Sequence, residues 1–180
     1  MRFPSLRHTV RQRRNALSEA EQAAHAENLA RWLCQHPQWP EWHHIAGYWP
    51  TDGEISPLPF LAKALQAGKK CYLPCLDKIL RFAAYTADMP LTLNRYQIFE
   101  PLHPDWIPLA QLDCVLVPMV AFDREKHRLG RGGGFYDKTF GHTPIPMLIG
   151  IAHALQEVPT IIPASWDIVL NMIATEQELI

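Results

Sequence analysis

The sequence lacks any long hydrophobic run and carries almost no net charge. Its 180 residues include 17 Lys and Arg against 18 Asp and Glu, so the formal net charge is −1 at pH 7. No segment approaches the roughly 20 apolar residues that a membrane-spanning helix needs. The charge balance gives no global field that favours nucleic acid, so we expect neither a membrane nor a nucleic-acid partner. The length predicts one domain over residues 1–180 with a substantial core.

Cysteine is also scarce, and its spacing excludes the common zinc motifs. The four cysteines are Cys34, Cys71, Cys75 and Cys114. Cys71 and Cys75 are separated by three residues, and no second pair follows. The nine histidines contain no HExxH pattern, so the sequence does not predict a histidine metal site. We expect reduced thiols in a cytoplasmic protein.

The N-terminal stretch has no acidic residue before Glu19. Five arginines precede it: Arg2, Arg7, Arg11, Arg13 and Arg14. No apolar segment of the kind found in secretory signals follows them. Leu6, Val10 and Leu17 share one helical face, which favours a structural helix. An organellar transit peptide and a nucleic-acid-binding arm are the alternatives.

The familiar nucleotide and nucleophile motifs are missing as well: there is no GxxxxGK[ST], no GxGxxG directly after a strand and no GxSxG. The stretch Arg128–Asp137 is present instead, with four glycines in five positions. Backbone N–H groups of such a loop can converge on an anion. Arg128 and Arg131 add permanently charged donors, and Asp137 is a hard oxygen ligand of the kind Mg²⁺ prefers. The stretch predicts a polyphosphate site, and an ordinary turn is the alternative.

The surroundings of this glycine loop favour a ligand site. Residues 112–120 form an apolar, β-branched run that predicts a buried strand, and residues 135–140 predict a helix. Ligands in open α/β sheets bind outside the carboxyl ends of the strands. Helix N-termini also attract anions.

The remaining pattern alternates helices with strands. Further helices are expected over residues 4–16, over 19–33 after a Ser18 capping box, and from Ser56-Pro57 to Gly68. Further strands are expected over residues 45–49, 71–74, 80–86, 147–152 and 168–175. Residues 87–111 are expected to be loop with an extended piece at 97–99, and 153–165 to be irregular. This order predicts an α/β fold in three layers with a mostly parallel central sheet.

Two segments, Val117–Asp123 and Arg128–Asp137, resemble the signature of the 5-formyltetrahydrofolate cyclo-ligases, also called 5,10-methenyltetrahydrofolate synthetases. The resemblance covers nearly the whole chain. It also includes Asp52–Ile55, Gly68–Lys70, Tyr72–Pro74, Glu100-Pro101 and Trp166-Asp167, in the family's order. It implies a fold similar to sugar-phosphate isomerases and CoA transferases. It also implies that ATP and Mg²⁺ convert 5-formyltetrahydrofolate to 5,10-methenyltetrahydrofolate, with release of ADP and phosphate.

The resemblance implies a role for each matching residue. The nucleotide site would comprise Arg7, Arg128, Leu129, Gly130, Arg131, Gly132, Gly133, Gly134, Phe135 and Tyr136. The folate would contact Glu54, Phe135 and Tyr136, and Mg²⁺ would bind Asp137 and Asp167. Trp49 is a further candidate for the pterin wall, because it lies shortly before Glu54 in the sequence. Arg131 is the candidate catalytic residue, as a clamp on the transferred phosphoryl group.

The chain departs from the family at two positions. Some members have Lys where Gly133 stands, and the family often has Lys where Phe3 stands, so Arg2 is a candidate replacement. Two other functions are open: a phosphosugar isomerase or CoA transferase of similar fold, and a non-catalytic folate- or nucleotide-binding protein. We expect only small-molecule partners and a monomer.

Overall fold

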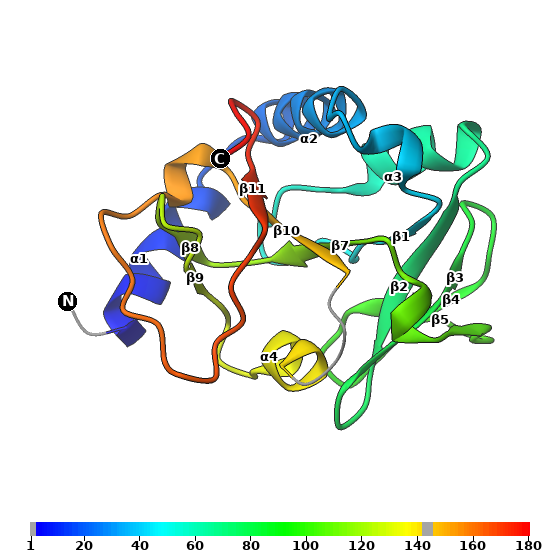
Figure 1. Cartoon of the computed structure of the whole chain (residues 1–180). Coiled ribbons are helices and arrows are strands. Elements are labelled where there is room, and N and C mark those ends of the chain that lie inside the picture. The colour runs from blue at the N-terminus through cyan, green and yellow to red at the C-terminus, as the bar shows by residue number, and fades with distance from the viewer. Residues whose placement is uncertain (1–2, 142–145) are drawn as a thin grey trace.

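A seven-stranded sheet forms the centre of the computed structural model, which describes residues 3–141 and 146–180 (Figure 1). The strand order is β11-β10-β7-β1-β2-β3-β6. The strands are β1 (His44–Ala46), β2 (Lys70–Leu76), β3 (Leu80–Tyr85), β6 (Trp106–Ile107), β7 (Cys114–Pro118), β10 (Met147–Ile151) and β11 (Met172–Ala174). The five strands from β11 to β2 are parallel, whereas β3 and β6 pair antiparallel. The predicted α/β fold with a mostly parallel sheet is therefore confirmed.

Helices cover both faces of this sheet and make three layers (Figure 1). The α-helices are α1 (Phe3–Asn15), α2 (Glu19–Cys34), α3 (Leu58–Gln66) and α4 (Phe135–Phe140), and the 3-10 helices are η1 (Trp39–Glu41), η2 (Leu109–Gln111) and η3 (Ala154–Gln156). On one face, Leu29 of α2 and Phe60 of α3 pack into a buried cluster with Ile45 of β1. On the other face, Phe140 of α4 and Phe82 of β3 are fully buried. Each such side chain contributes about 1.5–3 kcal/mol by leaving water.

Local signals fix the helix ends close to where the sequence places them. The Ser18 hydroxyl accepts from the Glu21 N–H at 3.3 Å, and Glu21 accepts from the Ser18 N–H at 2.8 Å, which is the predicted capping box. Helix α3 begins at Leu58, one residue later than predicted, and Ser56 Oγ accepts from the Leu58 N–H. Gly68 has a φ of 77° and ends α3 as predicted.

Two predicted strands are shorter than expected, and two small hairpins were missed. The strand predicted over residues 45–49 ends at Ala46, and that over 168–175 contains only Met172–Ala174. Within the predicted loop 87–111, β4 (Leu91–Leu93) pairs with β5 (Phe99–Pro101). After β7, β8 (Ala121–Phe122) pairs with β9 (Arg128–Leu129). The first two residues of the glycine stretch therefore lie in a strand, and its loop begins at Gly130.

Helix α1 packs beside the β8–β9 hairpin rather than against the main sheet (Figure 1). Its Val10 is 1% exposed and belongs to a small cluster with Val120 and Leu129. The predicted N-terminal helix is thus confirmed and places Arg7 against the glycine loop. Arg2 and the side chain of Phe3 lie outside the described residues. Over the described part of the chain, no helix combines the length and the apolar character needed to cross a membrane.

Candidate active site

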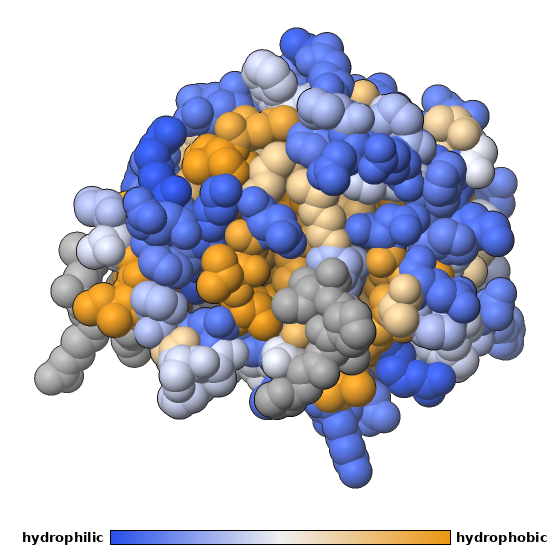
Figure 2. All heavy atoms as spheres, viewed as in Figure 1, coloured by the Kyte–Doolittle hydropathy of each residue, from blue (hydrophilic) through white to orange (hydrophobic). Residues whose placement is uncertain are grey.

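Two cavities meet at the glycine loop. The first has a volume of 380 Å³ and is mainly apolar, and the second has a volume of 240 Å³. Their shared wall consists of Arg128, Gly130, Gly134 and Asp137. Figure 2 shows that polar residues cover much of one face of the molecule, with separate apolar patches between them. The loop therefore lies between an apolar cavity and a more polar one.

The loop between β9 and α4 has a backbone that needs glycine at two positions. Gly132 has a φ of 103° and Gly134 a φ of 65°, which are values that other residues adopt only with strain. Gly134 is the N-cap of α4, so the first free N–H groups of that short helix follow the loop directly. Both glycines line the second cavity, and the predicted placement of a glycine loop before a helix is confirmed, whereas anion binding by this loop stays a prediction.

An arginine–carboxylate pair forms part of the shared wall. Arg128 Nη2 donates to Asp137 Oδ1 at 2.6 Å, and the two side chains are 6% and 14% exposed. The Ile168 N–H donates to the same oxygen at 3.1 Å. Within the described part of the chain, the Nε of Arg128 is buried and has no hydrogen-bond partner. A charged group at this wall would therefore meet a guanidinium that the protein itself satisfies only in part.

The second cavity brings together residues from three distant segments. Arg7 Nε of α1 donates to the Gly130 carbonyl at 2.8 Å and ties the helix to the loop. Asp167 lines the cavity with Asp137, and its Oδ2 accepts from the Ala164 N–H at 2.8 Å. Two carboxylates at one cavity match the oxygen ligands that Mg²⁺ prefers. Trp166 is 74% exposed and also lines this cavity, although the sequence analysis matched it to the family without giving it a role.

The first cavity contains a buried carboxylate paired with Arg131. Arg131 Nη2 lies 3.0 Å from Glu54 Oε1 and donates to the Thr51 carbonyl at 2.9 Å. Glu54 is 9% exposed. Burial raises the pKa of Glu54 above its usual value, and the charges of Arg131 and Arg14 oppose this shift only in part. Arg131 and Glu54 thus lie together at the first cavity, and Arg131 is not among the residues lining the second.

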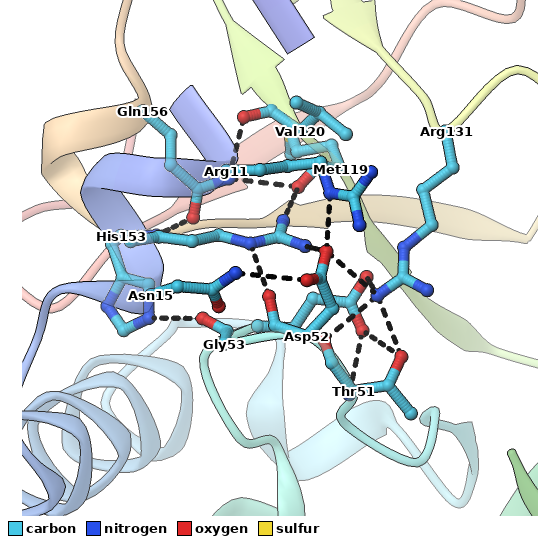
Figure 3. A network of polar contacts seen from close by, with 12 residues as sticks. Arg11, Asn15, Thr51, Asp52, Gly53, Met119, Val120, Arg131, His153 and Gln156 are labelled. Atoms are coloured by element: carbon cyan, nitrogen blue, oxygen red, sulfur yellow. Dashed lines mark hydrogen bonds and ion pairs between the residues drawn. The ribbon is translucent and has the colours of Figure 1, made fainter. Parts of the chain in front are cut away.

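A dense polar network holds the turn that carries Glu54 (Figure 3). Arg14 is fully buried and donates to the Asp52 carbonyl and to Asp52 Oδ2, both at 2.7 Å. Arg11 and Asn15 of the same helix also donate to this carboxylate, at 2.6 and 3.0 Å. Burial acts to raise the pKa of Asp52, but these hydrogen bonds and the charge of Arg14 hold it well below its usual value. The arginine-rich helix was the only sequence signal for this contact.

Aromatic rings form the walls of the first cavity. Trp49 packs against Phe99 of β5 with ring centroids 5.2 Å apart, and Tyr96 packs against Phe135 of α4 at 6.0 Å. Both pairs are edge-to-face, a favourable geometry for rings. Trp49, Phe135 and Tyr136 line the cavity as predicted. Tyr96 and Ile98, in the turn between β4 and β5, line it too and were missed, because only the packing of this hairpin brings them to the cavity.

The geometry defines an α/β protein whose glycine loop separates an apolar cavity from a polar one. The chain matches the 5-formyltetrahydrofolate cyclo-ligase family over residues 3–176. A cyclo-ligase of this name from Escherichia coli K12 is 34% identical over 178 residues, covering 94% of this chain and 98% of the relative. One from Haemophilus influenzae is 36% identical over 135 residues, covering 71% and 72%.

A solved structure supports the same assignment. The 5,10-methenyltetrahydrofolate synthetase of Aquifex aeolicus superimposes with a TM-score of 0.88 at 27% identity, covering 99% of this chain and 92% of that one. The chain belongs to the 5-formyltetrahydrofolate cyclo-ligase family. The family predicted from the glycine stretch is therefore confirmed.

Proposed function

We propose that the protein converts 5-formyltetrahydrofolate and ATP to 5,10-methenyltetrahydrofolate, ADP and phosphate. The observation that carries this proposal is the wall of Arg128, Gly130, Gly134 and Asp137 shared by the two cavities. A reaction between a folate and the terminal phosphate of ATP needs two ligands to meet at one place. Family membership supports the same reaction.

The apolar cavity is assigned to the folate. Trp49 and Phe135 would wall the pterin ring, with Tyr136 beside them. Glu54 would accept hydrogen bonds from the N–H donors of the pterin, because an ionised carboxylate acts only as an acceptor. The departure at Gly133 fits this cavity, because a Cβ there would meet the Phe135 ring at 2.9 Å. The ring of Phe135 would have to shift in a chain with Lys at this position.

The polar cavity is assigned to the nucleotide. The residues proposed to contact it are Arg7, Arg128, Leu129, Gly130, Gly132 and Gly134, which line this cavity, with Arg131, Gly133, Phe135 and Tyr136 approaching from the first cavity. Backbone N–H groups and the guanidinium of Arg128 would hold the phosphates. Asp137 and Asp167 would hold Mg²⁺, which when bound neutralises charge on the phosphate oxygens.

The chemistry asks mainly for positioning. The formyl oxygen of the folate attacks the γ-phosphorus and displaces ADP. N10 then attacks the formyl carbon, closes the ring and expels phosphate, which takes up the proton that N10 loses. An amide oxygen has no proton to lose, so the first step needs no general base. Arg131 is proposed to leave Glu54 and stabilise the charge of the transferred phosphoryl group. The competing role is to keep Glu54 oriented for the folate.

ADP release in the presence and absence of 5-formyltetrahydrofolate tests the proposal. We expect release only when both substrates and Mg²⁺ are present, with formation of the methenyl product in equal amount. ADP release without folate, or product formation without ATP, would contradict it. Binding of both ligands without turnover would favour a non-catalytic folate- or nucleotide-binding protein. Turnover of a phosphosugar or a CoA ester would favour a phosphosugar isomerase or CoA transferase. A monomeric state and a cytoplasmic location stay predictions, which light scattering and fractionation of cells would check.

A further inference from the structure

Three potential metal ligands meet outside both cavities. His25 of α2, His153 just before η3 and Glu176 just after β11 offer ligand atoms that all lie within 4.8 Å of one another. Over residues 3–141 and 146–180 this is the one group of three or more such side chains. The sequence did not predict it, because packing alone brings these distant segments together.

The hydrogen bonds around His153 direct its Nδ1 lone pair at His25, so His25 Nδ1–H is the donor between the rings, and a metal ion would release this proton to solvent or move it to Nε2 of His25. The Nδ1 atoms of the two rings are 2.9 Å apart. On its other side, His153 Nε2 lies 3.2 Å from the Gly53 carbonyl oxygen (Figure 3). A carbonyl can only accept, so this nitrogen carries the proton and Nδ1 does not. Neutral imidazole is the form that binds metals.

Glu176 is held with one oxygen toward the histidines. It is 7% exposed, and its Oε2 accepts from the Ala154 N–H at 2.9 Å. Its Oε1 lies 3.9 Å from His25 Nδ1. A tetrahedral ion bound at about 2.0–2.1 Å separates its ligand atoms by about 3.3 Å. The distance from His25 Nδ1 to His153 Nδ1 would have to widen, and that from His25 Nδ1 to Glu176 Oε1 to shorten, by about half an ångström each. The third pair, His153 and Glu176, lies within 4.8 Å and would have to shorten by up to about 1.5 Å. Rotations of the three side chains would have to supply these changes.

We propose that His25, His153 and Glu176 bind a divalent transition-metal cation of the zinc class. Two imidazoles and one carboxylate suit Zn²⁺, whereas Mg²⁺ prefers oxygen ligands alone. The Nε2–H of His153 bonded to the Gly53 carbonyl is the support that metal-bound histidines normally have. The side chain of His25 is 21% exposed, which gives the ion a route from solvent.

The site has a consequence for the turn that carries Glu54. The ion would fix His153, and His153 holds the carbonyl of Gly53, the residue before Glu54. Metal binding would therefore steady one wall of the first cavity without touching either proposed substrate. The proposed metal site does not depend on the proposed reaction. An experiment that contradicts one of these two proposals does not contradict the other.

Titration of the metal-free full chain with Co²⁺ tests the site. The Asp137→Asn variant serves as the background, so that the carboxylates proposed for Mg²⁺ contribute little. We expect one equivalent of Co²⁺ to produce the visible absorption bands of a nitrogen-ligated, four-coordinate ion. Zn²⁺ should displace these bands, and excess Mg²⁺ should not. Absence of the bands would overturn the proposal.

Variants tie the signal to the three side chains. His25→Gln and Glu176→Gln should each weaken Co²⁺ binding by about 100-fold or more, since even indirect supports of a metal are worth about 10–100-fold. The matched control is His8→Gln, an exposed histidine of α1, which should bind as the parent does. Zn²⁺ should raise the Tm of the parent and of His8→Gln but not that of His25→Gln, whose metal-free Tm reports that it folds. Equal Co²⁺ affinity in the parent and in His25→Gln would overturn the proposal.

Discussion

Glu54 is an acidic side chain held almost out of water, and its ionised form matters for the proposed folate contact. Glu54→Gln should lower kcat/KM for folate by about 10- to 150-fold, the equivalent of one charge-assisted hydrogen bond of about 1.5–3 kcal/mol. The KM for ATP should change little. The control Glu41→Gln removes an exposed carboxylate and should behave as wild type. Steady-state kinetics with each substrate varied in turn measure both constants, and equal losses for ATP and folate would count against a pterin role.

The raised pKa of Glu54 predicts a pH dependence with a definite sign. The carboxylate exists above its pKa, so affinity for folate should be full at high pH and fall as the pH drops through that raised value. The loss should begin at a higher pH than for an ordinary glutamate. Profiles of kcat/KM for folate in wild type and Glu54→Gln check this. A low-pH limb that persists in the variant would assign the titration to another group.

Arg131 can serve the phosphoryl group or Glu54, and kinetics separate the two roles. As a clamp, Arg131→Ala should lower kcat by about 100-fold or more with a smaller effect on the KM for ATP. Arg131→Lys should restore only part of the loss, because an ammonium cannot make the bidentate contact. If only the KM for folate rises, Arg131 positions Glu54, with which it pairs at 3.0 Å. If neither constant changes, neither role holds.

Asp137 combines an arginine contact with a proposed metal contact. Asp137→Asn should abolish Mg²⁺-dependent turnover, because an amide is a poor ligand for Mg²⁺. The fold should survive, since the amide oxygen can still accept from Arg128 and from the Ile168 N–H. Activity measured across Mg²⁺ concentrations, with circular dichroism of the same samples, tests both statements. Wild-type activity at limiting Mg²⁺ would exclude Asp137 as a ligand.

At the scale of elements, the fold could be predicted where a local signal was strong. The capping box of α2 and the apolar run of β7 gave these elements with small errors at their ends. The β8–β9 hairpin escaped because Lys126, with a φ of 68°, occupies a position where glycine would have marked the turn. The β4–β5 turn was not predicted for the same reason, because its residue with positive φ is Gln97, at 59°, and not glycine.

The candidate site likewise contains residues that the sequence could predict and residues that it could not. The glycine loop, Asp137 and Glu54 could be predicted, because each belongs to a contiguous motif. Arg14 and Tyr96 could not, since their places depend on how α1 and the β4–β5 hairpin pack against the sheet. The pairing of Arg131 with Glu54 is also a tertiary contact, because residues 54 and 131 are 77 positions apart in the sequence. Motifs identify the chemistry of a site, and packing determines its partners.

Helix α1 offers a prediction at this scale, because Arg14 ties it to the turn that carries Glu54. Arg14→Met should destabilise the protein by about 1–3 kcal/mol, since the Asp52 and Met119 carbonyls lose a buried donor. Arg13→Met, an exposed neighbour on the same helix, should stay within about 0.5 kcal/mol of wild type. Urea unfolding of the two variants compares them, and equal stability would mean that the buried contacts of Arg14 contribute nothing net.

At the scale of the whole molecule, the two cavities should bind two different ligands. Each has an aromatic side chain that does not line the other: Trp49 lines only the first, and Trp166 only the second. Trp49→Ala should raise the KM for folate and Trp166→Ala the KM for ATP, each by roughly 2- to 13-fold. Such factors correspond to about 0.5–1.5 kcal/mol for one aromatic contact. The other KM should remain near the wild-type value in each variant.

A third tryptophan controls for the general effect of removing a large ring. Trp106 of β6 is 38% exposed and lines neither cavity, so Trp106→Ala should leave both KM values unchanged. Because Arg128 belongs to the wall shared by both cavities, Arg128→Gln should differ from the three tryptophan variants. It should lower kcat and change the KM for folate as well as the KM for ATP. If Trp49→Ala and Trp166→Ala raised both KM values equally, the cavities would not be separate sites. The reaction would then have to occur with both substrates in one space, and the glycine loop would not divide them.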